Sequence, residues 1–175
     1  SMREIIGKII ASPIPVVVYV APSGTRAASA GFFILLSADV AVMAPGTNSG
    51  AAHPVFMGGG PMDPVMKEKV ENDAAAYLRS IVSKRNRNAE LAQKGVTESK
   101  SFTETEALQG HLIDLIANDQ ADLLKKLEGM EVTRFDGKKE VLHTEGAKNL
   151  HRAVIHDRLD DLVESGGIGR RLGIK

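Results

Sequence analysis

The sequence lacks cysteine and tryptophan, and it carries no net charge. Without cysteine there is no disulfide framework, no thiolate metal site and no cysteine nucleophile, so candidate nucleophiles are serine, threonine and lysine. The 22 basic residues balance 22 acidic ones, which leaves no overall field to attract a nucleic acid or an anionic membrane. We therefore expect no nucleic-acid partner.

Long apolar runs are also missing. The least polar stretch, residues 27–45, is interrupted by Asp39, whereas a membrane-spanning helix needs about 20 apolar residues in succession. The first eight residues are partly charged with no long apolar run behind them, so no signal peptide is predicted. Ser1 before Met2 is typical of an expression remnant, and we expect the chain to be a soluble piece of a longer protein.

Charge and proline are distributed unevenly along the 175 residues. Only three residues between positions 12 and 66 are charged, and all seven prolines fall there, whereas the chain beyond is charge-rich and proline-free. This contrast predicts a core in the first part and amphipathic helices around it in the second. We place a core domain at residues 1–128 and a C-terminal extension, a hairpin followed by a helix, at 129–175.

Hydrophobic periodicity predicts alternating strands and helices. Continuous apolar runs at 16–20 and 40–44 are typical of buried parallel strands, and the small apolar residues at 27–37 predict a buried helix between them. Residues 46–64 are typical of a loop. The other predicted elements are a strand at 112–117, a hairpin at 131–143 and helices at 2–11, 65–88, 89–94, 103–109, 119–127 and 148–164. Such alternation predicts an α/β fold.

Ser29 is the candidate nucleophile. It lies in the stretch Ala-Ala-Ser-Ala-Gly at residues 27–31, after a predicted strand and turn and at the start of the buried helix. Backbone N–H groups at a helix N-terminus stabilise an oxyanion, and small neighbours let a substrate carbonyl approach, so the position suits acyl transfer. The same context also fits a serine that only caps the helix or fills a tight packing site.

A nucleophilic serine needs a base, and His53, Lys67 and Lys69 are the candidates. A lysine accepts a proton only when it is neutral. Because the ordinary pKa of lysine is about 10.4, burial beside an apolar pocket must lower that pKa. Pairs of serine and lysine are a known variant of the catalytic triad.

Helical periodicity does not decide between the two lysines. At about 100° per residue, an apolar stripe runs along the predicted helix through Met66, Val70, Ala74, Tyr77 and Ile81. Lys67 lies nearer the centre of this stripe than Lys69 does. Lys69 also has Asp73 four residues later, a spacing typical of a solvated ion pair on a helix.

Several segments in succession resemble one known family. Residues 15–31 read PVVVYVAPSGTRAASAG, residues 43–54 read MAPGTNSGAAHP, and residues 68–77 read EKVENDAAAY. Together with shorter matches as far as Ile116, they resemble the ClpP-class serine protease domain of NfeD-type proteins, the stomatin-operon partner proteases. The resemblance covers most of residues 10–117.

This resemblance implies a ClpP/crotonase-like fold and a peptidase without metal or cofactor. Its nucleophile is the serine of Ala-Ser-Ala-Gly, here Ser29, its base is the lysine of the Glu-Lys-Val segment, here Lys69, and the N–H of Ala30 is an oxyanion donor. Members are oligomeric membrane proteins with this domain on the extracytoplasmic side. The implied substrate is a hydrophobic segment of a stomatin-like membrane protein.

His53 remains the alternative base. It follows Ser29 by 24 positions and is followed by a proline, which resembles ClpP peptidases with a serine, histidine and aspartate triad. The acid of that triad is expected two residues before Phe102, where the chain has Lys100, although Glu98 is close. A cation cannot orient an imidazole, so we favour Lys69 and treat His53 as part of the pocket wall.

One part of the family pattern is missing. A Gly-Gly turn upstream of the nucleophile supplies one oxyanion donor, and we expect this chain to begin after that turn and after the first strands of the fold. Because losing one donor typically costs 10²–10³ in rate, we expect weak or no activity from the chain alone. Two alternative functions remain: an assembly or interaction module without turnover, and a crotonase-type acyl-CoA enzyme.

Overall fold

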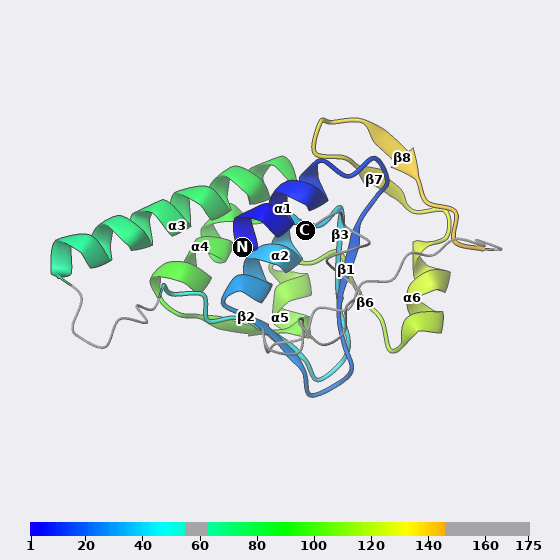
Figure 1. Ribbon diagram of the computed structural model, residues 1–175. Helices are drawn as coiled ribbons and strands as arrows, with labels where there is room; N and C mark the ends of the chain where they lie inside the picture. The colour runs from blue at the N-terminus through cyan, green and yellow to red at the C-terminus, as the bar shows by residue number, and fades with distance from the viewer. Residues whose placement is uncertain (55–62, 146–175) are drawn as a thin grey trace.

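Two small sheets, one hairpin and six helices make up the residues that the structure describes, 1–54 and 63–145 (Figure 1). The structure is a computed structural model. Its alternating strands and helices confirm the α/β prediction. The predicted helix at 148–164 lies outside the described residues.

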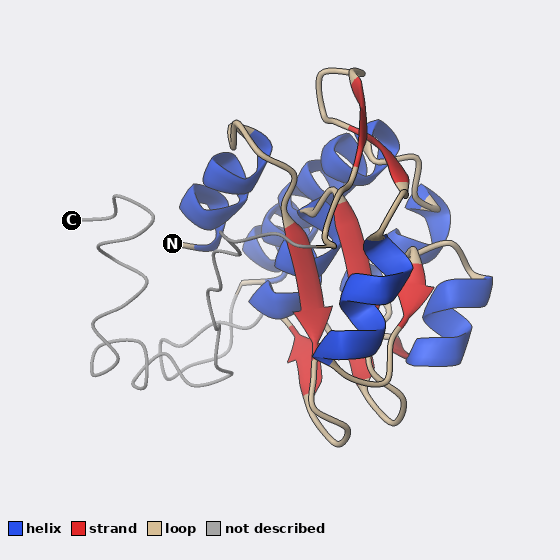
Figure 2. Ribbon diagram, turned by 90° about the vertical axis from the view of Figure 1, so that its right-hand side faces the viewer, coloured by secondary structure: helices blue, strands red, loops and turns tan. Residues whose placement is uncertain are grey.

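The first sheet is parallel and carries much of the core. Its strand order is β1 (Val17–Val20), β3 (Val40–Met43) and β6 (Leu115–Ile116), with Val17 opposite Val40. All four side chains of β3 are buried, as expected for the central strand of a sheet covered on both faces. Figure 2 shows these strands between helices.

The second sheet was not predicted. It consists of β2 (Arg26–Ala28), β4 (Asn48–Gly50) and β5 (Ser101–Thr103), in which β2 pairs with β4 in parallel and β4 pairs with β5 antiparallel. Each strand has only three residues, many of them small or polar, so hydrophobic periodicity gives no signal. The short β2 ends one residue before Ser29.

Helix α2 (Ala30–Ser37) lies at the centre of the molecule and is buried from Phe32 to its end. Phe32 stacks on Phe102 of β5, with ring centroids 6.2 Å apart. The other helices are α1 (Met2–Ile10), α3 (Pro64–Lys84), α4 (Ala89–Thr97), α5 (Glu104–Gln109) and α6 (Gln120–Leu127). None of the helices among the described residues has the length and apolar content needed to cross a bilayer.

Helix α3 extends beyond the body of the molecule at its N-terminal end (Figure 1). Its buried residues, Ala75, Leu78, Ile81 and Val82, all lie in the second half. The predicted apolar stripe is therefore wrong in the first half, where Met66 is 53% exposed. The stripe was predicted on the assumption that the whole helix packs on the core, whereas only the second half of α3 does.

The predicted hairpin is formed by β7 (Glu131–Thr133) and β8 (Lys139–Val141), with Asp136 and Gly137 at its turn. Gly137 has a φ of 88°, which glycine adopts without steric cost. Val132 packs with α6 and the outer face of the first sheet in a second apolar cluster.

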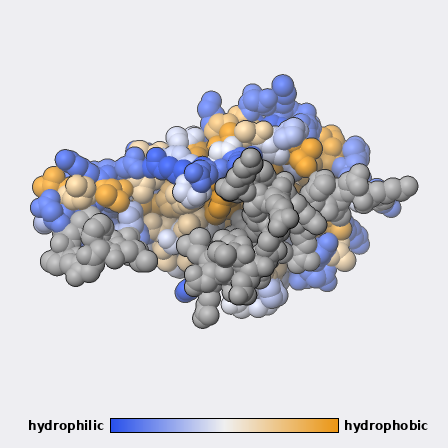
Figure 3. Space-filling model, in the orientation of Figure 1, coloured by the Kyte–Doolittle hydropathy of each residue, from blue (hydrophilic) through white to orange (hydrophobic). Residues whose placement is uncertain are grey.

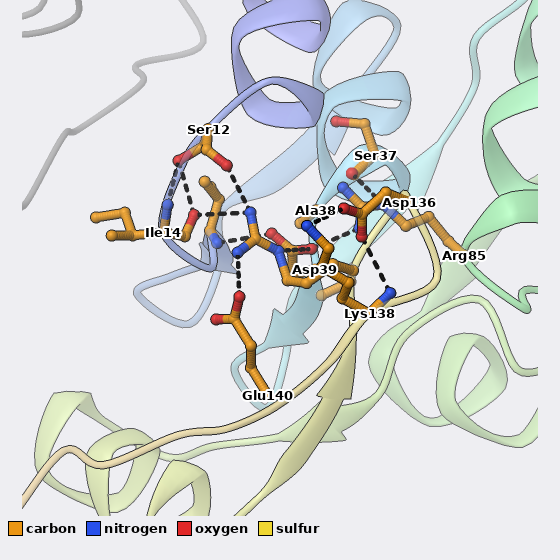
Figure 4. Close-up of polar contacts among 12 residues, drawn as sticks. Ser12, Ile14, Ser37, Ala38, Asp39, Arg85, Asp136, Lys138 and Glu140 are labelled. Carbon is orange, nitrogen blue, oxygen red and sulfur yellow. Dashed lines mark hydrogen bonds and ion pairs between the residues drawn. The ribbon is translucent and has the colours of Figure 1, made fainter.

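Buried charges join the hairpin to the end of α2 (Figure 4). The carboxylate of Asp39 accepts hydrogen bonds from Arg85 at 2.5 Å and from Arg134 at 3.1 Å. The guanidinium of Arg85 also donates to the carbonyl of Ser37, and that of Arg134 donates to the carbonyl of Ser12. Burial lowers the pKa of Arg85 below its ordinary value, and the charge of Asp39 opposes this shift.

Candidate active site

Ser29 has an unusual backbone conformation. It joins β2 to α2 with a φ of 51° and a ψ of −119°. Its N–H donates to the carbonyl of Gly50 at 3.1 Å, and its own carbonyl accepts from the N–H of Phe32 at 3.1 Å. Such a conformation costs a non-glycine residue about 1–3 kcal/mol and persists only where the surrounding structure holds it. Strain of this kind is concentrated at functional sites.

Gly50 makes this arrangement possible from the neighbouring strand. It pairs with Ala28 and has a φ of 127°. A Cβ at this position would lie 2.2 Å from the carbonyl oxygen of Lys100, so only glycine allows β4 and the strand after it to approach this closely. The next residue, Ala51, also has a positive φ, of 43°, and its N–H donates to the same carbonyl at 2.9 Å.

The side chain of Ser29 is free to react. It is exposed and makes no capping hydrogen bond to α2. The alternative that Ser29 serves as a helix cap through its side chain, or as a packed core residue, is therefore wrong. Ala30 is the first residue of α2, and its N–H has no acceptor within the helix. The hydroxyl and this N–H lie at the positive end of the helix dipole, which favours a developing oxyanion.

Lys69 lies in the exposed first half of α3. In the part of the chain that the structure describes, its ammonium has no hydrogen bond or ion pair, and none joins it to Ser29. The alternative in which Lys69 pairs with Asp73 is not observed, because that carboxylate binds Arg3 of α1 instead. The lysine is thus not held by a surface ion pair. Lys67, two residues earlier, is exposed as well.

His53 follows β4 and is three-quarters buried. Its Nδ1 lies 3.0 Å from the carbonyl oxygen of Val96 on α4 and 3.8 Å from Oε2 of Glu71 on α3. Because a carbonyl only accepts, Nδ1 carries the hydrogen. No hydrogen bond connects His53 with Ser29 among the described residues. The acid beside this histidine is Glu71, and sequence reasoning missed it.

The position where a triad acid was expected holds no acid. The Lys100 ammonium lies 5.5 Å from the centroid of the Phe102 ring. Two surface hollows, of about 330 and 320 Å³, lie elsewhere: one lies between the end of α3 and the hairpin turn, and the other between α6 and Thr144.

We compared the chain with known proteins. No family model matches it. It is 38% identical over 133 residues to the membrane-bound protease PH1510 of Pyrococcus horikoshii, covering 75% of this chain and 30% of the relative. A solved structure of the 1510-N membrane-bound stomatin-specific protease, a variant with a serine replaced by alanine, is 34% identical with a TM-score of 0.77. That match covers 88% of this chain and 75% of the other.

The chain belongs to this family of NfeD-type, ClpP-like membrane-bound proteases. The NfeD-type resemblance is thereby confirmed. A second structure of the protease, with a lysine replaced by alanine and a substrate peptide bound, is 33% identical with a TM-score of 0.75 and covers 94% of this chain and 75% of the other. ClpP1 from Listeria monocytogenes, 18% identical with a TM-score of 0.50, covers 70% of this chain and 68% of that one and supports the ClpP-like fold alone.

Proposed function

We propose that the protein is a serine endopeptidase in which Ser29 is the nucleophile, Lys69 the base and the N–H of Ala30 an oxyanion donor. The main observation in support of this proposal is the strained backbone conformation of Ser29 at the N-terminus of α2. The chain spans about a third of the length of the curated relative, so the activity, substrate and partners proposed here belong to the whole protein.

The relatives support the assignment of the two residues. In the 1510-N protease, the substituted serine and lysine are 41 positions apart, and Ser29 and Lys69 are 40 apart here. Lys67 would give a separation of 38. Assigning Lys69 requires a difference of one residue in the length of chain between the two motifs, whereas assigning Lys67 requires a difference of three. The spacing therefore favours Lys69.

The reaction proceeds through an acyl-enzyme. Neutral Lys69 takes the proton of the Ser29 hydroxyl as Oγ attacks the scissile carbonyl carbon, and the N–H of Ala30 stabilises the oxyanion. The C–N bond then breaks, and the leaving amine takes the proton from Lys69. A water molecule, deprotonated by Lys69, attacks the ester, which releases the new carboxyl group and restores the serine.

The surroundings of Lys69 support an apolar substrate. Val65 is 57% exposed, Met66 is 53% exposed and Val70 is 36% exposed, all within four residues of Lys69. Figure 3 shows apolar surface at this outer end of α3. A hydrophobic peptide segment that covers these side chains also removes water from the lysine amine, which favours its neutral form.

We extend the proposal to the whole protein from its relatives. The 1510-N protease is specific for a stomatin homologue, and we propose a hydrophobic segment of a stomatin-like membrane protein as the substrate class. We further propose a homo-oligomer attached to the membrane through the rest of the protein, with this domain on the extracytoplasmic side.

The test is the acylation of Ser29 in the whole protein by an apolar peptide ester, measured by intact mass and by the rate of ester release. We expect Ser29→Ala to form no adduct and Lys69→Ala to lower the rate by at least about 10²-fold. Lys67→Ala, a matched change two residues away, retains the wild-type rate. A Lys69→Ala variant with full activity would reject the lysine as base.

An interaction module without turnover is the second candidate. It is favoured by the exposed Lys69, which has no hydrogen bond to Ser29. If Ser29→Ala leaves partner binding and cellular phenotype unchanged while wild-type protein forms no adduct, this second function replaces the first.

A further inference from the structure

We propose that His53 and Glu71 form a positioning pair that sets where Lys69 lies relative to Ser29, an inference that rests on the proposed function. The pair joins the chain just after β4 to α3, with Nδ1 of His53 3.8 Å from Oε2 of Glu71. Both side chains are about three-quarters buried, at 24% and 26% exposure. Water therefore screens the interaction of this imidazole with the carboxylate less than it screens one between fully exposed groups.

The imidazole is fixed on a second element as well. Its Nδ1–H donates to the carbonyl of Val96, in the last turn of α4, at 3.0 Å. That carbonyl and the carboxylate of Glu71 are the polar groups that face His53 from α4 and α3 in the described part of the chain. The ring thus connects three elements and is not a free surface histidine.

Glu71 is the first anchored residue of α3. Every side chain from the start of the helix to Val70 is exposed, and Glu71 is the first that is partly buried. Lys69 lies two residues before it, in the exposed part. Without the contact to His53, the turn that carries Lys69 loses its nearest connection to the body of the molecule.

His53 is also linked to Ser29, the proposed nucleophile, through the backbone after β4. His53 lies three residues after Gly50, whose carbonyl accepts the N–H of Ser29. The backbone between them is fixed, because Ala52 donates to the carbonyl of Gly95 at 2.8 Å. A short path of contacts therefore runs from the backbone of Ser29 through His53 and Glu71 to the turn that holds Lys69. Displacing a catalytic group by about 1 Å can cost about 100-fold in rate.

The experiment uses the whole protein and measures kcat and KM for acylation of Ser29 by an apolar peptide ester, together with the thermal unfolding midpoint of each variant. The variants are His53→Leu, His53→Asn, Glu71→Gln and the double variant of His53→Leu with Glu71→Gln. Glu90→Gln is the matched control, since it removes a carboxylate that is 88% exposed in the first turn of a different helix, α4, whereas Val96 lies in the last turn.

We expect His53→Leu and Glu71→Gln each to lower kcat about 10- to 100-fold with KM nearly unchanged. The double variant should be no slower than the slower single variant, because both remove one contact. His53→Asn keeps an N–H donor near the position of Nδ1 and should retain more activity than His53→Leu. Glu90→Gln should match the wild type.

Three results would contradict the proposed positioning role of His53 and Glu71. Wild-type kcat in both Glu71→Gln and His53→Leu shows that the contact does not position Lys69. Activity losses in His53→Asn and His53→Leu that are equal and as complete as in Ser29→Ala identify His53 as the base. No adduct on wild-type Ser29 removes the proposed function together with the pair, a result distinct from the first two. If His53→Leu does not fold, the kcat of Glu71→Gln, a nearly isosteric change, decides whether the contact positions Lys69.

Discussion

Single residues set the conformation of Ser29, the proposed nucleophile. Its hydroxyl is presented by a backbone conformation that other residues avoid, and this conformation is held by the carbonyl of Gly50 and by the start of α2. The local motif of small residues was enough to single out Ser29 from the sequence. The strain itself depends on the close approach of β4 to Lys100, which is distant in sequence.

Replacing Ser29 should separate stability from activity. Glycine adopts a φ of 51° without the steric cost that alanine has, so we expect Ser29→Gly to be more stable than Ser29→Ala by about 1 kcal/mol, and both to be inactive. Urea unfolding measures the difference. Ala76→Gly in the exposed face of α3 is the control and should change stability in the opposite direction, by about 1 kcal/mol. Equal stability of the two Ser29 variants would show that the backbone there is unstrained.

The residues around the base could not be predicted in the same way. His53, Glu71 and Val96 come from three different elements, and no spacing in the sequence relates them. The sequence therefore offered His53 only as an alternative base. Its contacts with α3 and α4 suggest the positioning role instead.

Elements with strong local signals were predicted well. Helix α5 begins close to the start of the helix predicted at 103–109, with a capping box of Thr103 and Glu106, and the apolar runs form β1 and β3. Strands β2, β4 and β5 were missed because they are short, and because their pairing depends on tertiary contacts and not on hydrophobic pattern. The exposed half of α3 was misjudged for a similar reason, since periodicity does not show where a helix leaves the core.

The end of α2 depends on the buried charges beside it. Asp39 binds Arg85 and Arg134, and removal of one partner leaves uncompensated buried charge. We expect Asp39→Ala to lower the free energy of unfolding by about 3–5 kcal/mol. Denaturant unfolding measures this loss, with Glu90→Ala as an exposed control that changes stability by less than about 0.5 kcal/mol. A loss below about 1 kcal/mol in Asp39→Ala would contradict the assigned role.

The segment after the hairpin is held by Glu128. Its carboxylate accepts hydrogen bonds from the backbone N–H groups of Thr144 and Glu145, both at 2.6 Å, and these bonds lower its pKa from 4.5 to about 2. Because the pKa is lower in the folded state, this contribution to stability is complete above about pH 4.5 and is lost as the pH falls towards about 2.

We therefore expect amide exchange at Thr144 and Glu145 to become faster on acidification, relative to intrinsic rates, before the first sheet opens. Glu128→Gln should show the fast exchange at neutral pH as well. Unchanged protection in Glu128→Gln would show that the carboxylate does not hold this segment.

At the scale of the whole molecule, the proposed nucleophile and the proposed base belong to different parts. Ser29 joins the second sheet to the central helix α2, whereas Lys69 lies on the end of α3 that extends from the body (Figure 1). Under the proposed function, a substrate that binds between these parts would cover the apolar side chains near Lys69, exclude water from its amine and bring that amine towards Ser29.

The apolar side chains near Lys69 should therefore act on substrate binding. We expect Met66→Ser combined with Val70→Ser to raise KM for apolar peptides by at least about tenfold, since each buried side chain contributes about 1.5–3 kcal/mol. Stability should be nearly unchanged, because both side chains are exposed. Val141→Ser, which changes a side chain on β8 that is 50% exposed, is the control. An unchanged KM would place the substrate elsewhere.

The central claim is tested most directly by the distance between Oγ of Ser29 and Nζ of Lys69 in a crystal structure with a bound peptide aldehyde. The account predicts a covalent bond from Oγ to the aldehyde carbon and a distance of about 3 Å between Oγ and Nζ. A structure in which the aldehyde bonds to Oγ while Nζ stays in solvent, or in which His53 takes that place, would contradict it.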